Sequence, residues 1–157
     1  MTVVLNGSNL TIEDVVNVAR SGSEVAVSDD SWERIEKCRK MIQLKIDSHE
    51  IMYGVTTGIG EFSEVVLDSE QLEDFQKFLI YSHAAGIGKP LDREVVRAAM
   101  CGRVNVHCNG NSGGRPQITE KLIECLNAGI TPDCAEIGSV GACGDLSPMS
   151  QMAMTLM

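Results

Sequence analysis

Apolar residues recur along most of this chain at intervals of three and four positions, the spacing of one face of an α-helix. The pattern predicts six helices, and each opens on a residue that caps or starts helices well. These residues are Thr11, Asp30, Asp68, Asp92, Pro116 and Ser147. A short extended arm at residues 2–10, turned at Asn6-Gly7, precedes the helices. The sequence therefore predicts a mainly α-helical domain with a short extended N-terminal arm.

Two of the predicted helices have apolar faces that can be assigned residue by residue. The helix after Asp68 places Leu72, Phe75, Leu79 and His83 on one face. The helix after Asp92 has its expected core face at Val95, Val96, Ala99, Arg103 and Val106. Both helices are therefore expected to pack against the rest of the domain.

The last predicted helix begins close to the end of the given sequence. Ser147 is expected at its N-cap and Pro148 at its first helical position. No Gly, Asn or basic residue closes this helix before Met157. Residues 1–157 are therefore interpreted as the N-terminal domain of a larger protein, truncated inside the helix that begins near Ser147.

Charge and composition exclude several classes of partner. The formal net charge is −9 and no cluster of Lys and Arg is present, which argues against nucleic acid or an anionic membrane as a ligand. The longest apolar run is too short for a membrane span, and the N-terminus lacks a basic stretch followed by an apolar one. We therefore expect a cytoplasmic protein with a small molecule or another protein as its partner.

The six cysteines show no C-x-x-C pair and no histidine at zinc-ligand spacing. They are Cys38, Cys101, Cys108, Cys125, Cys134 and Cys143. This pattern favours reduced thiols that mostly fill the core, with no metal site.

The segment 138–145, Gly-Ser-Val-Gly-Ala-Cys-Gly-Asp, is the most unusual local feature because nearly all its side chains are small. Such a loop lets the backbone fold tightly on itself. If the nitrogen of Gly144 approaches the carbonyl carbon of Ala142, a five-membered ring closes, and loss of the Cys143 heteroatom leaves an exocyclic alkene. Glycine is expected at position 144 because a Cβ there would crowd the attack.

These residues, followed by Leu146-Ser147-Pro148, resemble the signature of the aromatic amino acid ammonia-lyases, which usually reads G-S-V-G-A-S-G-D-L-A-P. In that family the Ala-Ser-Gly triplet cyclises to 4-methylidene-imidazol-5-one, a built-in electrophile. The resemblance implies that Ala142, Cys143 and Gly144 form this group without an external cofactor. Cysteine replaces the usual serine, and elimination of sulfide gives the same alkene as elimination of water.

Two further segments resemble the same family. Residues 53–58, Tyr-Gly-Val-Thr-Thr-Gly, are similar to its Y-G-V-N/T-T-G loop, and residues 82–86, Ser-His-Ala-Ala-Gly, are similar to its S-H-A-x-G segment. The resemblance implies that Tyr53 is the catalytic base, that Ser82 and His83 recognise the substrate side chain, and that Asp145 assists ring formation.

The Ser82-His83 pair is typical of histidine ammonia-lyases, so L-histidine is the preferred substrate and urocanate the expected product. Thr56, and a similar Ser-His pair in some tyrosine aminomutases, leave an aromatic amino acid aminomutase open as an alternative. Helix N-termini directed at the site, such as the one at Ser147-Pro148, are expected to favour the ionised form of the base.

The resemblance also implies the fold and the assembly: a largely helical homotetramer, of which this chain supplies the N-terminal domain. The remaining site residues of the family lie downstream of the matched segments. The isolated chain is therefore expected to be incompetent, either as a fragment or as a subunit that needs a complementary C-terminal chain. The competing hypothesis is a non-catalytic remnant or assembly module.

Single residues also allow ordinary roles. Tyr53 could anchor its loop, His83 could be a hydrogen-bonded core histidine, and Cys143 could be a small buried thiol. The segment 110–114 formally matches the G-x-S-x-G pattern of serine hydrolases, but that motif requires a preceding strand. Because a helix is predicted there, a polar turn between two helices is favoured.

Overall fold

The computed structural model describes residues 1–157, the side chain of Ser69 excepted. Six α-helices are present, which confirms the predicted mainly α-helical fold. They are α1 (Ile12–Ala19), α2 (Asp29–Asp47), α3 (Ser69–His83), α4 (Arg93–His107), α5 (Pro116–Asn127) and α6 (Ser147–Met154). The short strands and the 3-10 turn are β1 (Thr2–Leu5), β2 (Glu24–Val27), η1 (Gly60–Phe62), β3 (Ile87–Pro90), β4 (Ala135–Ile137), β5 (Val140–Gly141) and β6 (Gly144–Asp145).

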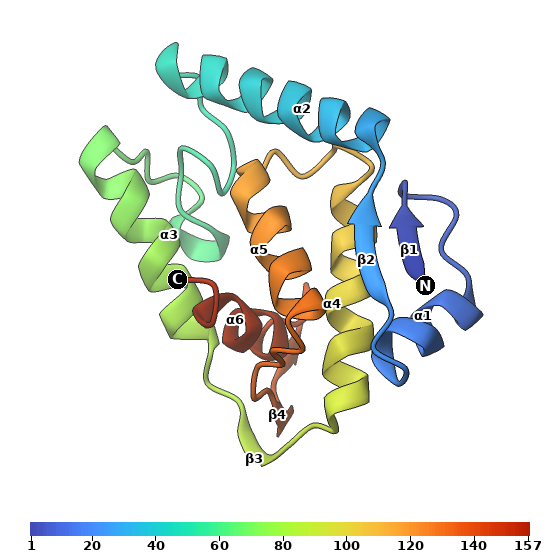
Figure 1. Cartoon of the computed structure of the whole chain (residues 1–157). Helices are drawn as coiled ribbons and strands as arrows, with labels where there is room; N and C mark the ends of the chain where they lie inside the picture. The colour runs from blue at the N-terminus through green and yellow to red at the C-terminus, as the bar shows by residue number, and fades with distance from the viewer.

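The helices α4 and α5 pack together at the centre of the molecule (Figure 1). On one side α1 packs against α4 and β2 against α5, and α2 crosses one end of α5. On the other side α3 packs against α6. The predicted site residues are carried by this second side, on α3, on the loop before it and on the segment that leads into α6.

The extended N-terminal arm is confirmed, and it pairs with a strand that the helical pattern did not predict. β1 and β2 run parallel, with Val3 opposite Val25 and Leu5 opposite Val27, and all four side chains are buried. The alternation in Glu24–Val27 is the signal for this strand, although four residues are short for an assignment. Asn127, at the end of α5, holds the strand by accepting from the nitrogen of Val25 (2.8 Å) and donating to its carbonyl (3.0 Å).

The capping predictions are confirmed at two helices. Thr11 and Asp68 each form a complete capping box at the start of α1 and α3. The start of α2 was predicted at Asp30, but the N-cap is Ser28 and Asp29 is already helical. Two adjacent aspartates suit the first turn of a helix, because negative charge is favourable there, and so they do not mark its boundary.

The predicted core face of α4 is confirmed at Val96, which is buried, and at Ala99, which packs against the core, and is wrong at the other three positions. Its side chains at Val95 and Val106 are about half exposed and Arg103 is exposed. The buried residues are Val96, Arg97, Met100, Cys101 and Val104. The prediction placed Arg103 on the core face and did not include Arg97, which is the arginine that the structure buries.

Arg97 is 2% exposed, and the acceptors of its side-chain hydrogen bonds are all backbone carbonyls. Its Nε and Nη2 donate to Val18 (3.2 and 2.9 Å) near the end of α1, and its Nη1 donates to Leu126 (3.1 Å) near the end of α5. Helix C-termini carry unpaired carbonyls and partial negative charge, so they are suitable partners for a buried cation. Burial lowers the pKa of Arg97, and the nearby positive charge of Arg93 adds to this effect.

We expect Arg97→Met to lower the free energy of unfolding by about 2 to 4 kcal/mol, since the Val18 carbonyl loses both guanidinium donors in the interior and the Leu126 carbonyl keeps only the Gly129 nitrogen. Arg103→Met, an exposed substitution of the same kind on the same helix, should change it by no more than about 0.5 kcal/mol. Urea denaturation followed by circular dichroism measures both. Equal stabilities for the two variants would contradict a structural role for the buried guanidinium.

Candidate active site

The predicted ring-forming residues lie at the tip of a tight hairpin. β5 and β6 pair antiparallel, with Val140 opposite Asp145 and Gly141 opposite Gly144, so Ala142 and Cys143 form a two-residue turn. The Cys143 side chain is exposed, which is inconsistent with the alternative of a small buried thiol. The tip is therefore free of packing that would oppose a change in its backbone.

Gly144 requires glycine for a reason other than the one expected. Its φ is +88°, in the region that L side chains rarely adopt. Outside the adjacent residues, a Cβ built there would meet no heavy atom within 4 Å. The constraint seen in the open hairpin is therefore conformational, and crowding of the attack during ring closure stays a prediction.

The carboxylate of Asp145 occupies the base of the hairpin. Its Oδ1 accepts from the backbone nitrogens of Ser139 (3.2 Å) and Ser147 (3.0 Å). A Cβ on Gly138 would lie 2.0 Å from the Asp145 Oδ2, so only glycine fits beside the carboxylate. The predicted N-cap at Ser147 is wrong: Leu146 is the N-cap and Ser147 is already in α6. Asp145 supplies the side-chain acceptor that Ser147 was expected to provide.

The segment after His83 packs against the same first turns of α6. A Cβ on Gly86 would lie 2.6 Å from the Ser147 hydroxyl. Gln151, one turn further on, accepts from the nitrogen of Ala135 (2.8 Å) and donates to the carbonyl of Gly86 (3.4 Å). β3 and β4 then pair antiparallel beyond these contacts. The His83 segment and the hairpin are thus held by one helix, and Gln151 is a positioning residue that the sequence pattern did not reveal.

His83 ends α3 and is half-buried. Its Nδ1 lies 2.8 Å from the carbonyl oxygen of Leu79, which also accepts from the Ser82 hydroxyl at 2.9 Å. The Ser82 hydroxyl also lies 3.0 Å from Nδ1. Because the Leu79 carbonyl oxygen can only accept, its contact favours the neutral tautomer with the proton on Nδ1 and the lone pair on Nε2. The hydrogen-bonded role considered for His83 is therefore present, and it leaves Nε2 as a possible acceptor for a substrate.

Tyr53 lies in the loop before α3, and its side chain is 67% exposed. Its hydroxyl accepts from the nitrogen of Gly60 at 3.2 Å, so the role of loop anchor is also present. Thr56 and Thr57 are buried, and their hydroxyls form hydrogen bonds only with backbone groups of residues 50–58. Gln76 of α3 donates to the carbonyl of Gly54 at 3.4 Å and connects this loop to the helix that carries His83.

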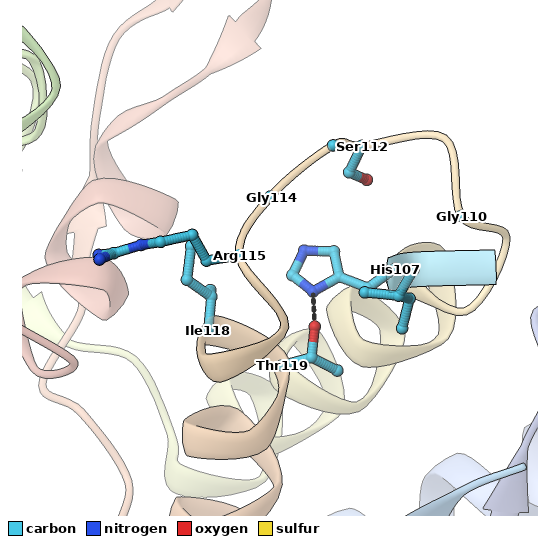
Figure 2. Close-up of a pocket in the computed structure, with 9 residues that line it drawn as sticks. His107, Gly110, Ser112, Gly114, Arg115, Ile118 and Thr119 are labelled. Carbon is cyan, nitrogen blue, oxygen red and sulfur yellow. Dashed lines mark hydrogen bonds between the residues drawn. The ribbon is translucent and has the colours of Figure 1, made fainter. Parts of the chain in front are cut away.

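A small cavity of about 70 Å³ lies away from these residues, under the loop between α4 and α5 (Figure 2). The His107 ring lies beneath this loop and its Nδ1 is 2.9 Å from the Thr119 hydroxyl, whereas Arg115 points away from it. Burial lowers the pKa of His107, and the positive charge of Arg103 lowers it further. Neither this cavity nor the shallow hollow beside Phe75 is lined by Tyr53, His83 or a hairpin residue.

The glycines of that loop have a packing role. A Cβ on Gly110 would lie 2.6 Å from the Arg34 Cβ, and one on Gly113 would lie 2.6 Å from the Ile42 Cγ1, both on α2. The residues before Gly110 belong to the helix α4, as predicted, so the strand that a serine-hydrolase nucleophile requires is not there.

The six cysteines differ in their surroundings. Burial raises the pKa of Cys101 to about 11 and also raises those of Cys108 and Cys134. All six thiols are free, and Cys143 is the exposed one. In the part of the chain that the structure describes, no three His, Cys, Asp or Glu side chains are placed to hold a metal ion. None of the described helices combines the length and apolar character needed to cross a membrane.

The helical fold, and the hairpin of small residues that leads into the N-terminus of α6, agree with the predicted class of aromatic amino acid ammonia-lyases. The sequence matches the family of aromatic amino acid lyases over residues 10–157, and the chain belongs to that family. The histidine ammonia-lyase of Caldanaerobacter subterraneus subsp. tengcongensis is 46% identical over 98% of this chain and 30% of its own length. The histidine ammonia-lyase of Treponema denticola is 42% identical over 98% of this chain and 30% of its own length.

Solved structures of the family share this fold. Tyrosine aminomutase from Streptomyces globisporus has a TM-score of 0.93 and 37% identity, covering 99% of this chain and 29% of that chain. Histidine ammonia-lyase from Trypanosoma cruzi has a TM-score of 0.89 and 35% identity, covering 98% of this chain and 30% of that chain. The chain thus spans about 30% of the length of the curated relatives described above.

The hydrogen bond from His83 to Leu79 predicts one tautomer. A long-range proton–nitrogen correlation spectrum, recorded where the imidazole is neutral, should show the proton on Nδ1 of His83, because the carbonyl oxygen can only accept. His83→Gln identifies the resonances by their disappearance. A proton on Nε2 would contradict this geometry and remove the acceptor that the substrate is expected to meet.

Proposed function

We propose that this chain is the part of an ammonia-lyase that makes the electrophilic group and contributes to substrate binding. The reaction eliminates ammonia from an aromatic amino acid, with L-histidine as substrate and urocanate as product. The observation that carries the proposal is the Ala142-Cys143-Gly144 tip, exposed on a hairpin whose base is held by Asp145. Family membership and the names of the histidine ammonia-lyase relatives support the reaction class and the substrate.

Ring formation uses atoms of the chain alone. The Gly144 nitrogen forms a bond with the Ala142 carbonyl carbon. The carbonyl oxygen departs as water with the amide hydrogens of Cys143 and Gly144, and a double bond forms between that carbon and the Cys143 nitrogen. The Cys143 Cα loses its proton and its Cβ loses sulfur, which departs as hydrogen sulfide and leaves an exocyclic alkene. The exposed tip and the positive φ of Gly144 suit this closure, and Asp145 would assist it from the base of the hairpin.

The roles of the other site residues are taken from the resemblance to the ammonia-lyase family. The finished 4-methylidene-imidazol-5-one would supply an electrophilic carbon for the substrate amino group. Tyr53 would remove a proton from the substrate. Ser82 and His83 would recognise the side chain, with the free Nε2 of His83 accepting from an imidazole N–H.

Localisation and assembly are part of the proposal. We place the protein in the cytoplasm, acting on a free amino acid, within a homotetramer or together with a complementary C-terminal chain. Tyr53 and Cys143 are exposed here, whereas elimination needs a site that excludes water. Further polypeptide must therefore enclose them.

An aromatic amino acid aminomutase is the second candidate. Its specific support is the solved tyrosine aminomutase from Streptomyces globisporus, which has 37% identity and a TM-score of 0.93. Both reactions use the same electrophile, so they differ only in whether ammonia is released or returned to the product.

Intact mass spectrometry tests ring formation. The purified chain should be lighter than its sequence by the mass of one water and one hydrogen sulfide. Cys143→Ser should lose two waters instead, because either heteroatom can depart from the same carbon. Cys143→Ala should keep its methyl side chain and lose no hydrogen sulfide, because its Cβ has no leaving group. Gly144→Ala should reduce cyclisation, because the left-handed φ at this position disfavours alanine.

A full, unmodified mass for the wild-type chain, with the Cys143→Ser variant also unmodified, would support the non-catalytic remnant. With L-histidine added, the isolated chain should produce no urocanate absorbance, since the enclosing parts of the site are supplied by other polypeptide. Urocanate from the isolated chain would show that these parts are dispensable.

A further inference from the structure

The loop between α4 and α5, residues 109–115, closes over the ring of His107 (Figure 2). His107 ends α4 and is half-buried, and its Nδ1 lies 2.9 Å from the hydroxyl of Thr119 on α5. Thr119 is 2% exposed, and among the described residues His107 is the one hydrogen-bond partner of its hydroxyl. A buried hydroxyl needs an acceptor for its proton, and Nδ1 with a lone pair provides it. The closed loop therefore fits the neutral imidazole that has its proton on Nε2.

The surroundings of His107 on α4 and α5 disfavour a second proton on its ring. Burial lowers the pKa of His107, and the positive charge of Arg103, one turn earlier on α4, lowers it further. The positive end of the α5 dipole has no side-chain cap, and Arg115, which precedes it, points away from the ring (Figure 2). Glu120, next to Thr119, is exposed. In the part of the chain that the structure describes, none of the ion pairs includes His107.

The charged groups that α2 directs at this loop are also positive. Arg34 donates to the carbonyl of Cys108 at 3.1 Å, and Arg39 donates to the carbonyl of Gly113 at 3.5 Å. Glu36, between them in sequence, is exposed and lies 3.6 Å from Lys40. An imidazolium under the loop therefore gains no carboxylate from α2.

The same loop supports the second half of α2. The buried side chains of this 19-residue helix, Ser31 and Ile35, belong to its first two turns. Further along, Gly113 is buried so closely against α2 that a Cβ on it would lie 2.6 Å from the Ile42 Cγ1. The hydrogen bond from Arg39 to Gly113 adds to this contact. The second half of α2 thus depends on the closed position of the loop.

We propose that His107 is an acid-sensitive latch, which holds residues 109–115 against α2 and α5 while it is neutral and releases them together with the second half of α2 when it is protonated. A proton on Nδ1 would take away the acceptor of the Thr119 hydroxyl. It would also place a cation beside Arg103 and the N-terminus of α5. Because α2 leads into the loop that carries Tyr53, release would loosen the support of that loop.

The direction of the response follows from the burial of the ring. Burial lowers the pKa of His107, so the closed state binds the second proton less readily than a released ring, whose ordinary pKa is about 6.5. Acidification therefore favours release, and the latch holds most firmly above about pH 6.5. This device is a property of the fold and does not require that the chain be a lyase.

Hydrogen–deuterium exchange of the full chain, followed by mass spectrometry at about pH 7.5 and about pH 5.5 and corrected for the intrinsic effect of pH, measures the release. In the wild type, exchange of residues 36–58 and 109–115 should rise several-fold at the lower pH. The rise should not exceed about tenfold, the limit set by a released ring with a pKa of about 6.5. Exchange of β1 should not change, because β1 belongs to the core on the other side of α4.

His107→Gln is the decisive variant, because its amide oxygen can accept from Thr119 but cannot bind a proton. Its exchange in both segments should be equal at the two pH values. His49→Asn is the matched control: His49 is exposed, lies inside the first segment and has a φ of +55°, which asparagine tolerates. This variant should respond to acid as the wild type does.

Arg103→Gln tests the same latch without altering the buried ring. Arg103 is exposed, so the fold should be kept, and loss of its charge should make His107 easier to protonate in the closed state and the acid response smaller. The proposal is overturned if the wild type shows no acid response in the two segments, or if β1 is released with them. It is also overturned if His107→Gln responds like the wild type, or, should that variant fail to fold, if Arg103→Gln does not reduce the response.

Discussion

The buried guanidinium of Arg97 fixes the frame on which the candidate site is built. It binds the last turns of α1 and α5 from the middle of α4, so the orientation of these three helices is set by one rigid, five-donor group. A buried cation without a carboxylate is costly unless dipoles replace the lost water, and two helix C-termini provide them. The segment after α5 carries β4 and the hairpin, so the position of the hairpin depends on this frame.

A second constraint acts at the start of α6. Asp145 binds the first backbone nitrogen of the helix, and Gln151 binds Gly86 and Ala135. The hairpin tip and the end of α3 are far apart in sequence, yet both are attached within two turns of one helix. Small residues are needed at Gly86 and Gly138 because the Ser147 hydroxyl and the Asp145 carboxylate fill the space that a Cβ would occupy. The Ser147 hydroxyl is buried there without a hydrogen-bond partner among the described residues.

Periodicity and capping were sufficient to predict the number and order of the helices, although the starts of α2 and α6 differ from the prediction. Thr11 and Asp68 illustrate this, since a capping box is formed by residues three positions apart. Arg97 could not be placed from the pattern, because its partners lie 79 and 29 residues away. Asp145 is different, because it accepts from the nitrogen two residues further on, a local pattern of aspartate that the prediction of an N-cap at Ser147 did not consider. The three motifs identified the candidate residues, but motifs carry no distances between segments.

Under the proposed function, the exposure of Cys143 creates two opposing requirements. A ring-forming tripeptide must be free to bend, and a turn at the tip of a short hairpin without core contacts has that freedom. The finished electrophile must instead be shielded, because water competes with an amine for it and weakens every charge interaction around the base. A single domain cannot be both open at this tip and enclosed around it. Under the proposed function, further polypeptide would resolve this conflict, since the ring would form first on the exposed hairpin and be covered afterwards.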